Sequence, residues 1–335
     1  MLRNAFRLSV AIFAGVLTTG CMSSLDDVAS KASEPIPGKL VAQMRSKSMS
    51  PSSPILVRIF KQESELEIWK RNAGGTYALL KTYPMCRWSG KLGPKKHGGD
   101  RQAPEGFYSV DASMLNPHSQ YYLSFNLGFP NKLEHALGYE GEALMVHGAC
   151  SSSGCYAMTD GGVAEIYAVA RDALKGGQGA FQVQAYPFRM TARNMAANRN
   201  DPEYAFWSDL KKGYDIFEVT HREPKVSYCG GRYVFDTQFP GGEPQDPLAP
   251  CPPSLSTDNP AVAARTETDR IATEQLVSSG MAPTAYAYSD GGMHASFRKL
   301  LAQNGAKALA KQTSMTSVPI SRPAAALADP DTATN

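Results

Sequence analysis

An alternation of apolar and polar residues between positions 55 and 83 constrains the fold of this chain more than any other sequence feature. Apolar side chains occupy every second position in the segments 55–60 and 65–68, and a third segment, 77–83, follows the turn sequence NAGG at 72–75. Successive side chains of a strand point to opposite faces, so a period of two indicates half-buried strands. The segment predicts an antiparallel meander of three strands.

Later segments predict further strands and two helices. We expect strands at 107–110, 143–146 and 181–185, the second of them central because it is continuously apolar. A helix should begin at Thr159 or Asp160 and end at Gly176, and another should cover 202–212 and end at Gly213. A hairpin at 225–235 should turn on Gly230 and Gly231. The predicted fold class is α+β, mainly β.

The charge of the chain excludes one class of partner. Its 34 basic and 31 acidic residues give a net charge of +3, and charged residues make up 19% of the chain. Proteins that bind nucleic acid concentrate basic residues, and no such excess exists here. We therefore expect no nucleic-acid partner.

The N-terminus resembles the signal of a bacterial lipoprotein. Arg3 and Arg7 precede an apolar run at 8–17, which is too short to span a bilayer, and small residues then lead into Cys21. The resemblance implies cleavage before Cys21, attachment of lipid to its thiol and anchoring of the protein to a membrane. The alternative is an ordinary secretory signal followed by a chance cysteine.

Composition divides the rest of the chain. After a signal peptide at 1–20, residues 21–54 lack apolar periodicity and are expected to form a tether. The predicted strands and helices place one folded domain at 55–236. Residues 237–335 are rich in Pro, Ala, Ser and Thr, so we expect a mostly disordered, dispensable tail, interrupted by one helix at 295–311.

An exported chain meets an oxidising compartment, so its six cysteines need an assignment. If Cys21 carries lipid and one other cysteine remains a free thiol, four are left to form two disulfides. The sequence leaves their pairing open. These four are Cys86, Cys150, Cys229 and Cys251.

The segment 145–158, MVHGACSSSGCYAM, combines the residue types of nucleophilic catalysis. A strand delivers His147, and Cys155 follows a Ser- and Gly-rich loop; a nearby imidazole raises the thiolate fraction of a cysteine. Gly154 leaves room for a carbonyl, and the backbone N–H groups of Ser153, Gly154 and Cys155 could form an oxyanion hole.

Two other interpretations of this segment stay open. His147, Cys150 and Cys155 could be three zinc ligands, although a structural site needs a fourth. The two cysteines could also be ordinary disulfide halves beside a core histidine. Nearby, Tyr121, Tyr122 and Phe125 could stack on a sugar, but core packing is the favoured role.

The pattern HG at 147–148 followed by SSGC at 152–155 resembles the signature of the L,D-transpeptidase (YkuD-type) catalytic domain, whose members remodel bacterial peptidoglycan. The resemblance extends from about residue 55 to about residue 235. Other segments that carry it are IFK at 59–61, WSG at 88–90, GPK at 93–95, GD at 99–100, PEGFY at 104–108, NLGFPN at 126–131 and YPFRMT at 186–191.

The resemblance implies a sandwich- or barrel-like β core with flanking helices, and it assigns roles to single residues. Cys155 would be the nucleophile, His147 the base, and Gly148 the residue whose carbonyl orients the imidazole. Ser152 and Tyr156 are candidates for substrate binding. No metal ion or organic cofactor is implied.

The family resemblance also implies a location and a substrate. It places the protein in the periplasm, acting on peptidoglycan stem peptides and on proteins attached to murein. Ser153 stands where the family more often has His, and the Arg that usually follows the nucleophile segment is absent. These departures favour the branch that hydrolyses bonds at diaminopimelate and releases attached protein. The alternatives are a transpeptidase and a catalytically idle peptidoglycan-binding lipoprotein.

Overall fold

The structure, a computed structural model, describes residues 30–256, 259–284 and 286–330. At its centre lies a five-stranded sheet in the order β3-β2-β1-β10-β5, in which β1 and β10 are parallel and the other neighbours antiparallel. This confirms the predicted meander and the strands expected at 107–110 and 181–185. The strands are β1 (Ile55–Phe60), β2 (Glu65–Arg71), β3 (Tyr77–Pro84), β5 (Gly106–Asp111) and β10 (Ala180–Tyr186).

A second five-stranded sheet, in the order β4-β9-β8-β7-β6, packs against the first. The rings of Phe125 and Phe181, one from each sheet, lie 5.6 Å apart in the shared core. The strand expected at 143–146 is β8 (Met145–His147) and is central, but it begins later because Ala143 has a φ of 55°, which a strand does not accept. The other strands are β4 (Arg87–Trp88), β6 (Leu115–Asn116), β7 (Ser124–Asn126) and β9 (Tyr156–Ala157).

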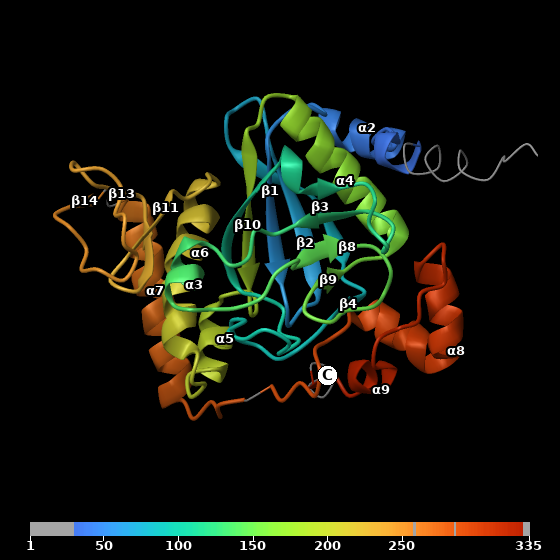
Figure 1. The fold of residues 1–335 in the computed structure, drawn as a ribbon. Helices are drawn as coiled ribbons and strands as arrows, with labels where there is room; N and C mark the ends of the chain where they lie inside the picture. The colour runs from blue at the N-terminus through green and yellow to red at the C-terminus, as the bar shows by residue number, and fades with distance from the viewer. Residues whose placement is uncertain (1–29, 257–258, 285, 331–335) are drawn as a thin grey trace, which may run out of the picture.

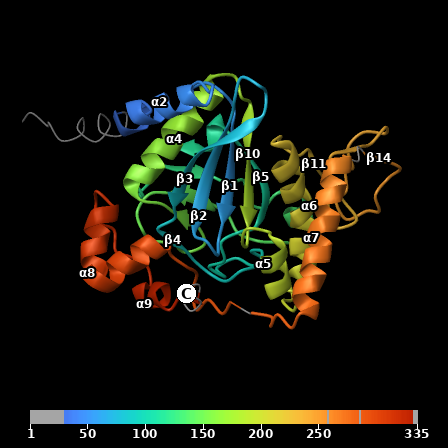
Figure 2. The same ribbon diagram turned by 180° about the vertical axis from the view of Figure 1, so that it is seen from behind.

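Helix α4 (Asp160–Lys175) covers the core as predicted. The Thr159 hydroxyl accepts a hydrogen bond from the Gly162 N–H at 3.0 Å, and Gly176 ends the helix. Beside α4 lies α2 (Gly38–Ser46), as both ribbon views show (Figure 1, Figure 2). Its Leu40 and Met44, one turn apart, are buried. The expectation that 21–54 is a simple tether is therefore wrong for 38–46.

Helix α6 (Tyr204–Thr220) continues through Gly213, where the sequence predicted its end. A Cβ atom at Gly213 would lie 2.5 Å from the Phe107 ring and 2.6 Å from the Phe235 ring. The glycine therefore permits close packing of α6 and does not stop it. Around α6 lie α3 (Lys132–Ala136), α5 (Ala192–Ala197) and the predicted hairpin of β11 (Val226–Cys229) and β12 (Arg232–Phe235).

The expectation of a mostly disordered tail at 237–335 is wrong for the part of it that the structure describes. It contains β13 (Thr237–Gln238), β14 (Leu255–Ser256), α7 (Pro260–Ser278), α8 (Ala295–Thr313) and α9 (Pro323–Leu327). The predicted helix at 295–311 is α8, interrupted at Gly305. Composition misled because the few apolar residues of this segment join a cluster completed by Cys86 and Cys150. That cluster contains Cys86, Cys150, Met293, Leu301, Leu309, Ala310, Ile320 and Ala326.

The four cysteines left open by the sequence pair as Cys86–Cys150 and Cys229–Cys251. Cys155 is a free thiol. Cys21 and the signal segment lie outside the described residues. Within 30–256, 259–284 and 286–330, no helix combines the length and the apolar character needed to cross a bilayer.

The packing of α6 yields a stability prediction. Gly213→Ala should lower the free energy of unfolding by about 1–3 kcal/mol, because the new methyl group overpacks two aromatic rings. Gly161→Ala in α4 is the matched control: a Cβ there meets nothing within 4 Å, and loss of glycine flexibility should stabilise by about 0.5–1 kcal/mol. Urea unfolding measures both. Equal effects of the two substitutions would contradict the packing argument.

Candidate functional site

The parallel pairing of β8 with β9 brings His147 and Cys155 together. Val146 is paired with Tyr156 and His147 with Ala157. Paired residues point to the same side of a sheet, and so do residues two positions apart along a strand. Cys155 lies two positions before Ala157, the partner of His147, so Cys155 and His147 lie on the same face. The structure thus assembles the two residues that the sequence analysis singled out.

His147 is held as a neutral imidazole. Its side chain is only 3% exposed, and its Nδ1 donates to the carbonyl oxygen of Gly148 at 2.5 Å. A carbonyl can only accept, so the proton resides on Nδ1 and Nε2 keeps a free lone pair. Burial lowers the pKa of His147 to about 4, against a smaller raising effect of the Gly148 carbonyl. The tautomer is the one a general base requires.

Tyr121 covers the imidazole. Its ring stacks on that of His147 at a centroid distance of 4.7 Å, and its carbonyl accepts the Gly148 N–H at 3.0 Å. Tyr121 itself is 40% exposed, so it separates the histidine from solvent. Sequence reasoning favoured core packing for this residue and missed its contact with the site, because Tyr121 lies in a loop with no periodic pattern to indicate its direction.

Cys155 is a partly buried thiol in its resting state. Its Sγ donates to the carbonyl of Ala143 at 3.7 Å. Burial raises the pKa of this thiol, against smaller lowering effects of the Met145 backbone and the Lys95 charge. Burial therefore drives both members of the pair, the thiol and the imidazole, toward their neutral forms.

The loop before Cys155 is held by serines. The Ser152 hydroxyl donates to the Cys155 carbonyl at 2.7 Å, and the Gly154 N–H donates to the Ser89 hydroxyl at 2.6 Å. Gly154 adopts a φ of +116°, which favours glycine. Because its N–H is already engaged, the prediction that Gly154 supplies an oxyanion donor is wrong for this conformation. The N–H groups of Ser153 and Cys155 remain as candidates.

Both side chains predicted to bind substrate are buried. Ser152 is 4% exposed, and its hydroxyl donates a hydrogen bond to the Cys155 carbonyl within the loop. Tyr156 is fully buried, and its hydroxyl donates to the Pro104 carbonyl. Both positions lie next to the thiol, but their side chains shape the loop from inside. The prediction that these two side chains contact substrate is therefore not supported by their position.

One cavity, of about 500 Å³, adjoins the loop at Ser153. Its lining carries charge of both signs, positive from Lys95 and Arg101 and negative from Glu142. The Lys95 amine is held by Asp100 at 2.5 Å. Such a cavity suits a ligand that bears both an anionic and a cationic group. Its lining residues are Lys95, Gly98, Gly99, Arg101, Gly141, Glu142, Leu144 and Ser153.

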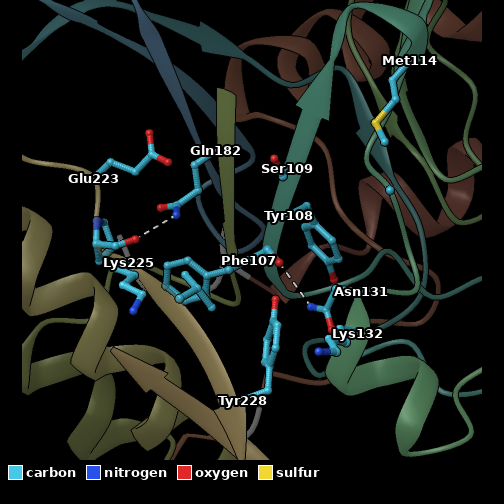
Figure 3. Close-up of a pocket in the computed structure, with 13 residues that line it drawn as sticks. Phe107, Tyr108, Ser109, Met114, Asn131, Lys132, Gln182, Glu223, Lys225 and Tyr228 are labelled. Carbon is cyan, nitrogen blue, oxygen red and sulfur yellow. Dashed lines mark hydrogen bonds between the residues drawn. The ribbon is translucent and has the colours of Figure 1, made fainter. Parts of the chain in front are cut away.

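A second cavity, of about 480 Å³, lies away from the thiol (Figure 3). It is enclosed by β5, β10 and the segment leading into β11. Gln182 donates to the Pro224 carbonyl at 3.0 Å on one side, and Asn131 donates to the Phe107 carbonyl at 3.1 Å on the other. Its lining contains neither Cys155 nor His147, so it is not the candidate reaction site.

The disulfide Cys86–Cys150 decides between the interpretations of this segment. The sulfur of Cys150 is bonded to that of Cys86, so Cys150 cannot act as a thiolate ligand to zinc with His147 and Cys155. Cys155 is free, so it is not a disulfide half either. What the site presents is one thiol beside one imidazole of fixed tautomer, an arrangement that supports nucleophilic catalysis.

Comparisons with known proteins relate the chain to one named protein. No protein-family model matches the sequence. Putative L,D-transpeptidase YafK of Escherichia coli strain K12 is 49% identical over 182 residues, which cover 54% of this chain and 74% of that protein. Its counterpart in Escherichia coli O157:H7 gives the same values.

Two solved structures show weak likeness. The helical cell shape determining protein Pgp2 of Campylobacter jejuni is 15% identical, over 59% of this chain and 81% of that chain, with a TM-score of 0.33. Bd1075 of Bdellovibrio bacteriovorus is 14% identical, over 52% of this chain and 76% of that chain, with a TM-score of 0.30. The family assignment therefore rests on the sequence match.

Burial of His147 yields a pH prediction. The folded protein binds its proton with a pKa of about 4 and the unfolded chain with one near 6.5, so below 6.5 the unfolded state takes up more protons and stability falls as pH falls toward 4. Between those values the wild type should lose about 3 kcal/mol more stability than His147→Gln. Urea unfolding of both proteins at several pH values in this range measures the difference. Subtracting the two curves removes the effect of the titratable groups that both proteins share. Parallel curves would contradict it.

Proposed function

The chain belongs to the L,D-transpeptidase family, and from this premise we propose that it hydrolyses peptide bonds at diaminopimelate residues of peptidoglycan through a Cys155 thioester. A peptidoglycan-modifying activity follows from the family. The observation that carries the finer proposal is the free Cys155 thiol on the same sheet face as a His147 held by the Gly148 carbonyl.

The first half of the reaction forms the thioester. The Nε2 atom of His147 accepts the proton of the Cys155 thiol as the sulfur attacks the carbonyl carbon of the scissile bond. The N–H groups of Ser153 and Cys155 would stabilise the resulting oxyanion. The protonated imidazole then gives its proton to the leaving amine, and the carbon–nitrogen bond breaks.

The second half resolves the thioester. His147 takes a proton from a water molecule that attacks the thioester carbonyl, and the proton returns to the sulfur as the acid product leaves. An amine in place of water would give transpeptidation, so the outcome depends on what occupies the acceptor position. Hydrolysis is supported by the resemblance of residues 155–158 and 126–131 to the branch that releases attached protein.

Charge in the cavity beside Ser153 supports the substrate assignment. A diaminopimelate residue presents a free carboxylate and an ammonium group at one end of its side chain. Arg101 would bind the carboxylate and Glu142 the ammonium group, while the Lys95 amine stays paired with Asp100. The opening of this cavity next to the nucleophile loop would place the adjoining peptide bond near the sulfur.

The remaining parts of the proposal concern location and organisation. We place the protein in the periplasm, anchored by lipid on Cys21, with a catalytic domain that begins near residue 55. Its partners would be stem peptides and proteins attached to murein. The disulfide Cys86–Cys150 in the wall of the site suits an oxidising compartment.

Incubation with defined muropeptides tests the reaction. The wild type should release a Lys- or Arg-ended peptide from tripeptide-linked muropeptides, and mass spectrometry should detect little 3–3 crosslinked product. Cys155→Ala should lower turnover by at least about a thousandfold, because the covalent step is lost.

Thermal unfolding provides the control for this variant, which should retain the fold. Accumulation of crosslinked dimers from tetrapeptide donors, with linked peptides left uncut, would indicate a transpeptidase. Absence of any product from the wild type would leave a binding lipoprotein as the better description.

A further inference from the structure

The C-terminal segment 286–330 is docked on the strand that borders the site. The Tyr288 ring lies 4.8 Å from that of Trp88 in β4. Arg87, fully buried, donates to the carbonyls of Asp290 at 2.6 Å, Gly292 at 3.0 Å and Ser321 at 3.0 Å. Figure 2 shows α8 and α9 beside this edge of the second sheet. These backbone contacts fix residues 290 and 321 relative to the sheet.

From this docked segment, Ser321 contacts the nucleophile loop directly. Its hydroxyl accepts the Ser152 N–H at 2.9 Å. Ser152 in turn donates from its hydroxyl to the carbonyl of Cys155 at 2.7 Å. The position of the Cys155 backbone is therefore coupled to a residue that lies far along the chain.

Asp290 contacts the same loop through Arg101. Its carboxylate lies 2.9 Å from one Arg101 Nη atom, and the guanidinium donates to the Ser153 hydroxyl at 3.0 Å and to the Ser152 carbonyl at 3.3 Å. Arg101 has a φ of 58°, a conformation that a residue with a side chain keeps only when its surroundings enforce it. Asp290 is itself 5% exposed.

A third contact reaches the beginning of the loop. The buried Asp160 carboxylate accepts the Ala149 N–H at 2.8 Å with one oxygen and the Met315 N–H at 2.7 Å with the other. Ala149 also has a positive φ, of 59°. The C-terminal segment thus contacts the loop directly at Ser152, and it is linked to Ala149 through Asp160 and to Ser153 through Arg101.

We propose that Ser321 and Asp290 are positioning residues for catalysis, which hold the loop 149–155 so that the Cys155 sulfur and the oxyanion N–H groups keep their working geometry. The segment that carries them is part of the catalytic unit. The expected effect on turnover rests on the proposed function. The geometry of the loop exists without substrate, so it can be tested by an experiment that uses no substrate.

The test compares Ser321→Ala with Ser317→Ala in the full-length protein. Ser317 lies on the same segment with an exposed side chain that makes none of the contacts named above, so its variant is a matched control. The readout is the rate at which iodoacetamide alkylates Cys155 at a fixed, mildly alkaline pH, with mass spectrometry of peptides to assign the site. Thermal unfolding of both variants accompanies it.

Ser321→Ala should alkylate at least about threefold faster than wild type, because a loosened loop exposes the thiol. Asp290→Asn should act in the same direction, Ser321→Thr should restore the wild-type rate, and Ser317→Ala should match wild type. With stem-peptide substrate, Ser321→Ala should lower kcat by about tenfold and leave KM nearly unchanged.

Equal alkylation rates for Ser321→Ala, Asp290→Asn and wild type would overturn the proposal, whatever their turnover. Faster alkylation of both variants, reversed in Ser321→Thr, supports it even if the wild type cleaves no stem peptide. A wild type that cleaves no stem peptide would refute the proposed function and not the positioning role, so failure of one proposal can be distinguished from failure of the other.

Discussion

The parallel pairing of β8 and β9 is the constraint on which the site depends. Parallel neighbours are normally joined by a crossover of a dozen residues or more, yet here residues 148–155 make the whole connection. The loop has hydrogen bonds of its own, such as the one from the Ser152 hydroxyl to the Cys155 carbonyl, and other parts of the chain hold it as well. The disulfide to Cys86, the Asp160 carboxylate and the Ser89 hydroxyl each hold one point of it.

Burial also sets the protonation of the two residues at this site, His147 and Cys155. It favours the neutral imidazole at His147 and the protonated thiol at Cys155, so neither residue carries charge in the absence of substrate. A thiol kept protonated is a poor nucleophile toward oxidants and stray electrophiles. In the proposed reaction, proton transfer from Cys155 to His147 would then be part of the attack on substrate.

The sequence allowed prediction of features that repeat locally or match a known signature. Strand alternation located β1 to β3, the Thr159 cap located α4, and the HG and SSGC patterns located His147 and Cys155. Prediction failed where a residue acts through a distant contact. Gly213 looked like a stop because nothing local announces the aromatic rings beside it, and the C-terminal helices looked disordered because their cluster is completed by cysteines from the core. The contact of Tyr121 with His147 was missed because Tyr121 lies in a loop without a periodic pattern.

The hydrogen bond between Ser152 and Ser321 joins residues 169 positions apart. A chain is synthesised from its N-terminus, and contacts of such separation form late because closing a long loop costs entropy. Nearly the whole polypeptide must therefore be complete before the loop around the thiol is fully ordered. A nascent chain that stalls before residue 321 therefore leaves the Ser152 N–H without this partner.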